Sequence, residues 1–176
     1  MSTSFKRTAA AGFTLIELLI VVIILAIISA IAIPQFSAAT SDAQSSAADA
    51  NLATVRNAIE LYRAQHSGNV NPGVNATGGG ACPDGGEAGS GKANSEEALK
   101  EQLMYASNAA GQTCTVAGGE FRYGPYLRQG IPANPLDNTA TILVSTEGAK
   151  IDPTNAGGWA YDVKSGEFAL NTKADD

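Results

Sequence analysis

The sequence has little of what most enzymes and nucleic-acid-binding proteins require. It contains one histidine, His66, and nothing marks an activated serine beside it, so a Ser-His-Asp catalytic set is not expected. Basic residues number 11 against 17 acidic ones, and no basic patch is present for nucleic acid. The glycines do not form a phosphate-binding loop, because the required Gly-Lys-Ser/Thr is missing. We therefore expect no enzymatic activity. The sequence gives no support for a nucleic-acid partner.

Cysteine is also scarce, since the chain has only Cys82 and Cys114. Their spacing has no CxxC character, which argues against redox catalysis and against a zinc site. Outside the cytoplasm, in an oxidising compartment, two such cysteines pair more often than not. We predict a disulfide between them, with free thiols as the alternative. The bridge would restrain a glycine-rich surface loop that is predicted from residue 67 to 94.

What the chain has in excess is an apolar run, from 13 to 33. Beyond Glu17 only Ser29 interrupts it, and its length is close to the ~20 residues that a helix needs to cross the hydrocarbon core. Lys6 and Arg7 precede the run, and basic flanks of membrane helices stay in the cytoplasm. We therefore predict a single-pass membrane helix with a cytoplasmic N-terminus and a remainder on the other side of the membrane.

A secretory signal peptide is the alternative, because it also has a basic head and an apolar segment. Its apolar region is usually about 7–15 residues long and ends at a small-residue cleavage site, whereas this run is longer. A signal peptide would also leave Glu17 without a purpose, since carboxylates within a bilayer are costly and by default functional. We therefore favour a helix that the mature protein retains.

The residues around Glu17 carry a family resemblance. Gly12 followed by Phe13-Thr14-Leu15-Ile16-Glu17, with the apolar helix after it and Pro34 near its end, resembles the class III signal of type IV pilins and type II secretion pseudopilins. The resemblance covers about the first third of the chain. It implies that a prepilin peptidase cleaves between Gly12 and Phe13, that the same enzyme N-methylates Phe13, and that Glu17 acts in assembly.

The charge of Glu17 has a physical logic of its own. Cleavage before Phe13 would create a cationic amine one helical turn from Glu17, on the same face. The two groups can pair within one subunit. Between subunits, a buried Glu17 that meets a neighbour's amine gains far more in a low dielectric than in water, and the pair would fix the axial register between helices. The physical argument allows both arrangements, and the resemblance to type IV pilins implies the second.

Pro34 is expected to kink the helix, because proline removes one backbone donor and crowds the preceding turn. Ala26 stands where the resembling proteins have a glycine, which leaves the extent of any loosening open. Beyond Pro34, residues at three- and four-residue spacing predict a continuing helix whose bulky stretch, 52–64, packs on a head. The predicted organisation is a leader at 1–12, a transmembrane and assembly helix at 13–34, a continuing amphipathic helix at 35–66 and a globular head at 67–176.

The head is predicted to be α+β and pilin-like, with the long N-terminal helix packed against a small C-terminal antiparallel sheet. A short helix is expected from Asn94 or Ser95 to Ser107. The last two strands should form a hairpin, with Trp159 and Tyr161 on the face that also carries Phe168. The strands are predicted at 141–145, 158–163 and 167–170.

Other polar residues of the head give weaker indications. His66, at the end of the long helix, is expected to favour the helix dipole or to meet water. The carboxylates of Asp137, Glu147 and Asp152 lie in loops around the first strand, and the resemblance to major pseudopilins, which bind calcium in such loops, makes them weak calcium candidates. Solvated acidic loops are the alternative, and no cofactor is predicted.

The resemblance implies a structural subunit of a type IV-like filament, a helical homo-oligomer built at an assembly platform of the bacterial inner membrane. The filament would be either an extracellular type IV pilus or the pseudopilus of a type II protein secretion system. A weaker resemblance, in Tyr126-Leu127, Ile131-Pro132 and Asn134-Pro135, is to major pseudopilins and related short pilins, and it favours the secretion system. The alternative function is a membrane-anchored periplasmic binding domain that does not polymerise. Glu17 and the methylation-type signal favour the filament, because a tether needs neither.

Overall fold

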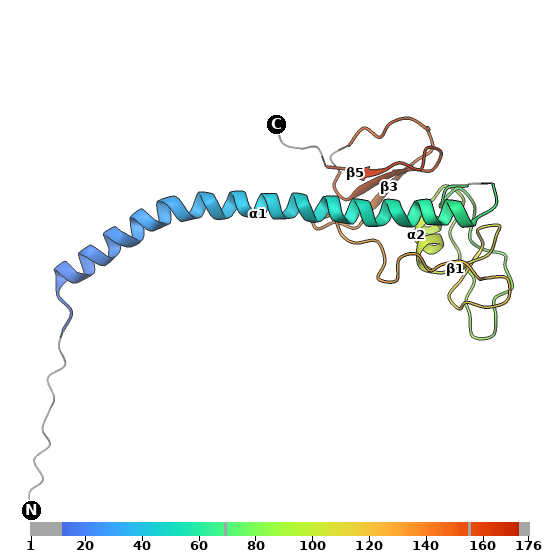
Figure 1. The fold of residues 1–176 in the computed structure, drawn as a ribbon, viewed down its shortest axis with the longest axis horizontal. Coiled ribbons are helices and arrows are strands. Elements are labelled where there is room, and N and C mark those ends of the chain that lie inside the picture. The colour runs from blue at the N-terminus through green and yellow to red at the C-terminus, as the bar shows by residue number, and fades with distance from the viewer. Residues whose placement is uncertain (1–11, 69, 155, 173–176) are drawn as a thin grey trace, which may run out of the picture. The chain divides into compact units, whose positions relative to one another are not determined.

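The computed structural model describes residues 12–68, 70–154 and 156–172 (Figure 1). The predicted leader therefore lies outside the described residues up to residue 11, and Lys6 and Arg7 lie there with it. The chain divides into two compact units, Met1–Ala43 and Gln44–Asp176. Helix α1 (Leu15–Gln65) contributes to both units. We call the second unit the head.

Helix α1 remains α-helical through Pro34, so the proline interrupts the hydrogen-bond pattern without ending the helix. The part of α1 that belongs to the first unit is curved (Figure 1). In the head, the predicted inward face of α1 is confirmed, because its bulky residues are buried in the core. These residues are Leu52, Val55, Ile59 and Tyr62.

The head contains a three-stranded sheet, whose strands lie in the order β3-β4-β5. The predicted hairpin is confirmed: β4 and β5 pair antiparallel, with Tyr161 opposite Phe168. β3 pairs parallel with β4, so the sheet is mixed, whereas we predicted an antiparallel one. The long connection 146–158 permits this, since parallel neighbours need a crossover of about a dozen residues or more. The strands are β3 (Ile142–Ser145), β4 (Trp159–Asp162) and β5 (Phe168–Leu170).

The short helix α2 (Glu96–Met104) is capped by Ser95, whose Oγ accepts a hydrogen bond from the Ala98 N–H at 3.1 Å. The helix ends before the predicted Ser107. The chain instead turns into β1 (Ala106–Ser107), which pairs antiparallel with β2 (Thr113–Cys114). Sequence alternation could not reveal strands this short.

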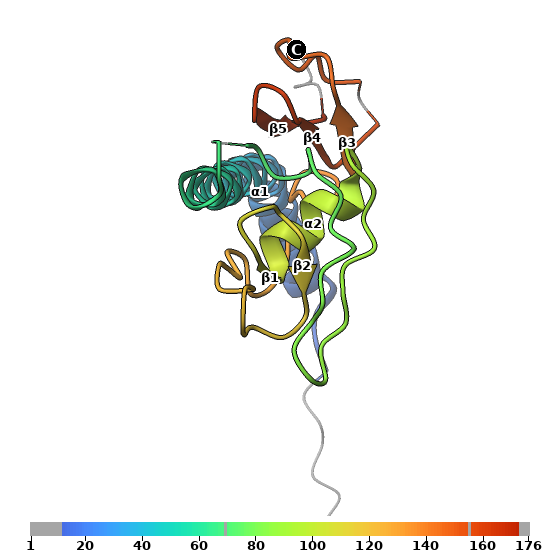
Figure 2. The same cartoon turned by 90° about the vertical axis from the view of Figure 1, so that its right-hand side faces the viewer.

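Both helices of the head pack on the same face of the sheet, with α1 beneath β5 and α2 beneath β3 (Figure 2). The side chain of Arg56 on α1 donates to the Phe168 carbonyl at 2.9 Å, and Glu96 on α2 accepts from the Ile142 N–H at 3.1 Å. The α+β class is therefore confirmed. The sheet and α2 contribute these buried residues to the core: Trp159, Tyr161, Val163, Phe168, Leu99 and Leu103.

The glycine-rich segment 67–94 is tied to α2 by two adjacent side chains. Gln102 is fully buried. Its Oε1 accepts from the Gly73 N–H at 2.6 Å, and its Nε2 donates to the carbonyls of Asn75 at 3.2 Å and Gly111 at 2.7 Å. Both amide hydrogens and the carbonyl oxygen of this side chain are therefore used to fix loop backbone.

Glu101 holds a more distant part of the same segment. Its carboxylate accepts from the N–H groups of Ser90 at 3.1 Å and Gly91 at 3.0 Å, and from the hydroxyl of Thr77. Burial alone would raise the pKa of Glu101, but these hydrogen bonds favour the charged form and lower its pKa. The predicted surface loop is thus an ordered layer over α2.

Candidate membrane and assembly segment

The predicted cleavage site lies just before α1. Gly12, Phe13 and Thr14 have no regular secondary structure, and α1 begins at Leu15. The Phe13 side chain is 82% exposed. The bond between Gly12 and Phe13 is therefore outside the helix, where a peptidase can reach it without unwinding a hydrogen-bonded turn.

Thr14 and Glu17 form a reciprocal cap on the first turn of α1. The Thr14 N–H donates to Glu17 Oε2 at 2.9 Å, and the Glu17 N–H donates to Thr14 Oγ1 at 3.3 Å. The Thr14 hydroxyl also donates to Glu17 Oε2 at 2.7 Å. This arrangement is a capping box. The Thr-x-x-Glu spacing that predicts it is present in the sequence, and our sequence analysis missed it. The carboxylate of Glu17 therefore turns back toward the start of the helix.

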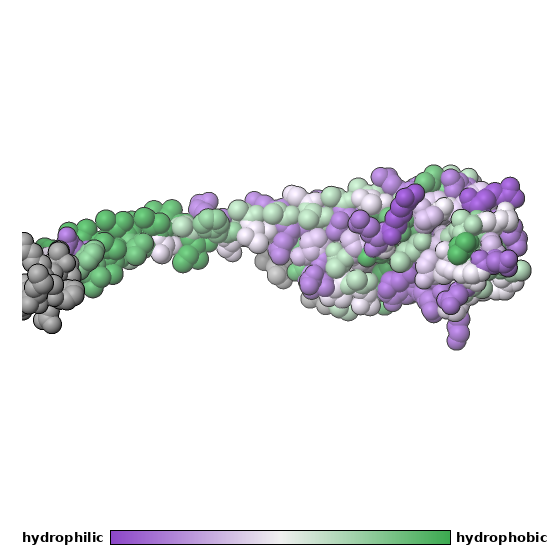
Figure 3. Space-filling view, turned by 90° about the horizontal axis from the view of Figure 1, so that it is seen from below, coloured by the Kyte–Doolittle hydropathy of each residue, from purple (hydrophilic) through white to green (hydrophobic). Residues whose placement is uncertain are grey.

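Apolar side chains surround the N-terminal part of α1. Figure 3 shows a nearly continuous hydrophobic surface there, and most of its large side chains, for example Leu18 and Ile24, are at least half exposed. Among the described residues, α1 is the helix long and apolar enough to cross a membrane. Such a surface needs lipid or other helices around it, because water disfavours so large an apolar area.

The two cysteines are joined in the structure by a disulfide, with their Cα atoms 5.8 Å apart and a sequence separation of 32. Cys114 is fully buried beside Phe121 and Ala106, which form a second, smaller apolar cluster. The bridge attaches the glycine-rich segment to β2.

Reduction of this disulfide is expected to lower the free energy of unfolding of the head by about 4 kcal/mol, because the unfolded chain regains the freedom that a closed loop of this length removes. Urea unfolding of the detergent-solubilised protein, followed by the fluorescence of the lone Trp159, measures this. A variant with Cys82→Ser and Cys114→Ser should match the reduced protein and ignore reductant. Equal stability of the oxidised and reduced wild type would contradict the expectation.

The three calcium candidates do not come together. Asp137 uses its carboxylate within the head, where it accepts from the N–H groups of Gly158 at 2.6 Å and Thr139 at 2.8 Å. Glu147 and Asp152 are exposed in the 146–158 connection. Within the described residues, no three His, Cys, Asp or Glu side chains are grouped to hold a metal. Calcium binding stays a prediction without a site.

His66 is buried, with 5% of its surface exposed, so the expectation that it meets water is wrong. Its ring stacks on Tyr62 at 3.7 Å between centroids. Nδ1 lies 2.8 Å from the Tyr62 carbonyl and therefore carries the proton, while Nε2 accepts from the Ser107 hydroxyl at 3.1 Å. Burial lowers the pKa of His66. Ser107 is itself fully buried, so this serine and histidine both lie inside the head.

Asp162 is a buried carboxylate that the sequence analysis did not single out. It is fully buried on β4. Its oxygens accept from the N–H groups of Lys164 at 3.0 Å, Ser165 at 2.7 Å and Gly148 at 3.0 Å. Burial alone would raise the pKa of Asp162, but hydrogen bonds from Ser165, Gly148 and Ser145 lower it to about 2. The carboxylate joins the hairpin turn to the 146–158 connection and is structural.

Comparison with known proteins bears on the N-terminal segment. Residues 7–33 match the family described as the prokaryotic N-terminal methylation motif. The chain is also 46% identical over 59 residues to the type IV narrow pilus major component PilA5 of Thermus thermophilus. That match covers 34% of this chain and 51% of PilA5, so the chain spans about half the length of this relative. No solved structure matches the chain.

Proposed function

From an N-terminal segment of the type IV pilin kind, we propose that the chain is a structural subunit of a type IV-like filament and assembles through α1. The observation that carries the proposal is the prepilin-type segment at 7–33, which coincides with the exposed apolar part of α1. A carboxylate, Glu17, stands at the start of this surface. Neighbouring copies of α1 can cover such a surface once the subunit leaves the lipid.

The proposed life of the subunit begins in the inner membrane, with its N-terminus in the cytoplasm and its head in the periplasm. A prepilin peptidase cuts between Gly12 and Phe13, and Phe13 is methylated. Glu17 then pairs with the Phe13 amine of a neighbour as an assembly platform adds subunits to a helical filament. Pro34 adjusts the path of α1 during packing. The role is structural, and no cofactor is invoked.

The filament type has two candidates. The relative PilA5 is named a pilus component, and this supports a type IV pilus. The stretch from Tyr126-Leu127 to Asn134-Pro135 instead resembles type II secretion pseudopilins. Where the filament ends up separates the candidates: a pilus is recovered from the cell exterior by shearing, while a pseudopilus stays within the periplasm.

The mature polypeptide is expected to begin at N-methylated Phe13. Mass spectrometry of the protein extracted from envelopes and from filaments measures this start directly. In a matched Gly12→Val variant the peptidase site is altered, so the unprocessed precursor should accumulate in the membrane. A mature start beyond Pro34 would mean that the apolar helix is discarded, and both the filament and the membrane anchor would then be wrong.

The alternative is a membrane-anchored periplasmic binding domain that never polymerises. It predicts the same membrane extraction but no filament under any growth condition. Electron microscopy of cells that produce the full chain, with immunolabelling of the head, therefore separates the two functions.

A further inference from the structure

A groove of about 600 Å³ opens on the head between α1 and the segment 126–132. Leu127 and Pro132 supply apolar lining, and Thr54 contributes from α1. Arg128 is the charged residue of this lining, and its side chain is exposed. Among the described residues, no carboxylate forms an ion pair with Arg128. We call this site the Arg128 groove.

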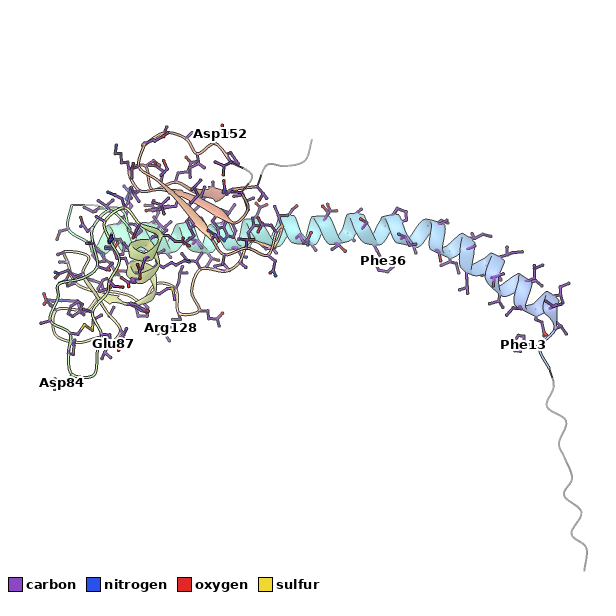
Figure 4. The ribbon with its side chains drawn as sticks, turned by 180° about the vertical axis from the view of Figure 1, so that it is seen from behind. Phe13, Phe36, Asp84, Glu87, Arg128 and Asp152 are labelled. Atoms are coloured by element: carbon purple, nitrogen blue, oxygen red, sulfur yellow. A yellow bond between two sulfur atoms is a disulfide. The ribbon has the colours of Figure 1, made fainter. Side chains whose placement is uncertain are left out.

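The residues 83–87 form an acidic projection, which we call the acidic tip (Figure 4). Asp84 is exposed there, Glu87 stands at its base, and neither pairs with a cation in the described part of the chain. The turn is closed by a hydrogen bond of 2.9 Å from the Gly86 N–H to the Pro83 carbonyl.

The base of the acidic tip is fixed to β2 and the residue that follows it. The Cys82–Cys114 disulfide holds one side. On the other side, the Glu87 N–H donates to Thr115 Oγ1 at 2.9 Å, and the Thr115 N–H donates to the Glu87 carbonyl at 3.0 Å. A projection that is already ordered loses little conformational entropy when it binds.

The acidic tip and the Arg128 groove occupy different levels of the head. In Figure 4 the labelled Asp84 and Glu87 lie nearer the C-terminal end of α1, and Arg128 lies farther toward its N-terminal side. They do not pair within one head. Two complementary patches at different levels make a heterologous contact, which repeats from copy to copy when copies are displaced along one direction.

We propose that the acidic tip of one subunit docks in the Arg128 groove of the next copy of this chain. The carboxylates of Asp84 and Glu87 would pair with the Arg128 guanidinium, which is suited to bind carboxylates through two parallel hydrogen bonds. Gly85 and Gly86 carry no side chains, so the turn can approach the apolar lining closely. The inference rests on the proposed function, because an ordered array of copies supplies the displaced neighbour.

Charge complementarity selects this occupant over the other exposed acidic loop. Glu147 and Asp152 flank Lys150 in sequence, so that loop carries its own cation. Figure 4 shows Asp152 on the opposite side of α1 from Arg128 and Asp84. The acidic tip has no lysine or arginine between Cys82 and Ser90. The negative charge of the acidic tip is therefore uncompensated until a partner provides a positive charge.

A charge exchange in cells that produce the full chain tests the contact. Arg128→Glu alone, and Asp84→Lys with Glu87→Lys, should each lower the ratio of filament subunits to membrane subunits about tenfold, because like charges then face each other. All three substitutions together should restore the ratio to within about threefold of wild type. Asp152→Lys and Arg122→Glu, matched exposed changes elsewhere on the head, should leave it within about twofold.

Failure of this contact can be told from failure of the proposed function. If the wild type makes no filaments, the filament role itself fails. If the wild type makes filaments but the triple variant is no better than either parent, or Arg128→Glu assembles normally, the contact is absent. A groove that serves another acidic ligand would give this last result. Equal membrane levels and an intact Cys82–Cys114 disulfide in every variant show that the heads have folded.

Discussion

Replacing Glu17 with alanine is expected to give a subunit that is cleaved, methylated and held in the membrane, yet builds no filaments. The apolar run and the Gly12–Phe13 bond remain, so processing and insertion need nothing that the substitution removes. The neighbour's Phe13 amine would be left without its counter-charge in an apolar bundle, where unpaired charges are strongly disfavoured. Sheared filaments are expected to fall below detection, and membrane fractions should contain normal amounts of subunit.

Two further variants are needed to separate charge pairing from helix capping, because Glu17 also stabilises the first turn of α1. Glu17→Gln keeps a side chain that can serve in a capping box but removes the charge. Thr14→Ala breaks the cap and keeps the charge. If charge pairing drives assembly, Glu17→Gln should lose filaments and Thr14→Ala should keep them. The reverse result would assign Glu17 to helix capping and defeat its assembly role.

Replacing Asp162 with alanine should cost the head about 3 kcal/mol of unfolding free energy. Three backbone N–H groups, those of Lys164, Ser165 and Gly148, lose a charged acceptor, and donors left without a partner in a buried site are costly. Trp159 lies on the same strand and reports unfolding of this sheet. Asp152→Ala is the matched control, since that carboxylate is exposed, and it should change the stability by less than about 0.5 kcal/mol.

The same carboxylate predicts a pH dependence. The folded-state pKa of Asp162 is about 2, below its ordinary value of 3.8, so the unfolded chain binds the proton more readily. Its contribution is therefore complete above about pH 4 and is lost as the pH falls toward 2. About 2 kcal/mol should disappear across this window in the wild type. Asp162→Ala should lack this component, and parallel pH profiles for the two proteins would contradict the assignment.

Strong local signals made part of the molecule predictable. The apolar run and the three- and four-residue spacing beyond Pro34 predicted α1, and the alternation of Trp159 and Tyr161 predicted the β4–β5 hairpin. The direction of β3 was not predictable, because its pairing depends on how the 146–158 connection folds back. The burial of His66 was missed for a similar reason: Ser107 approaches it from a strand 41 positions away.

Of the candidate functional residues, those in a local motif were predictable, and those that depend on contacts between distant segments were not. Gly12, Phe13 and Glu17 stand close to one another in sequence, so a local motif could place them. The Thr14 cap was also readable from its spacing and was missed. The Arg128 groove was not accessible to sequence analysis, because it needs α1 and the segment 126–132 to meet in space.

The neighbouring side chains of Glu101 and Gln102 have a consequence for local unfolding. They stand side by side on a helix of nine residues, yet their hydrogen bonds reach backbone from Gly73 to Gly91. Fraying of α2 would therefore remove these hydrogen bonds together, while the Cys82–Cys114 disulfide and the hydrogen bonds between Glu87 and Thr115 would still hold the middle of the segment. The two flanks of this layer should thus become accessible to proteases when one short helix frays, whereas its middle should stay protected until the disulfide is reduced.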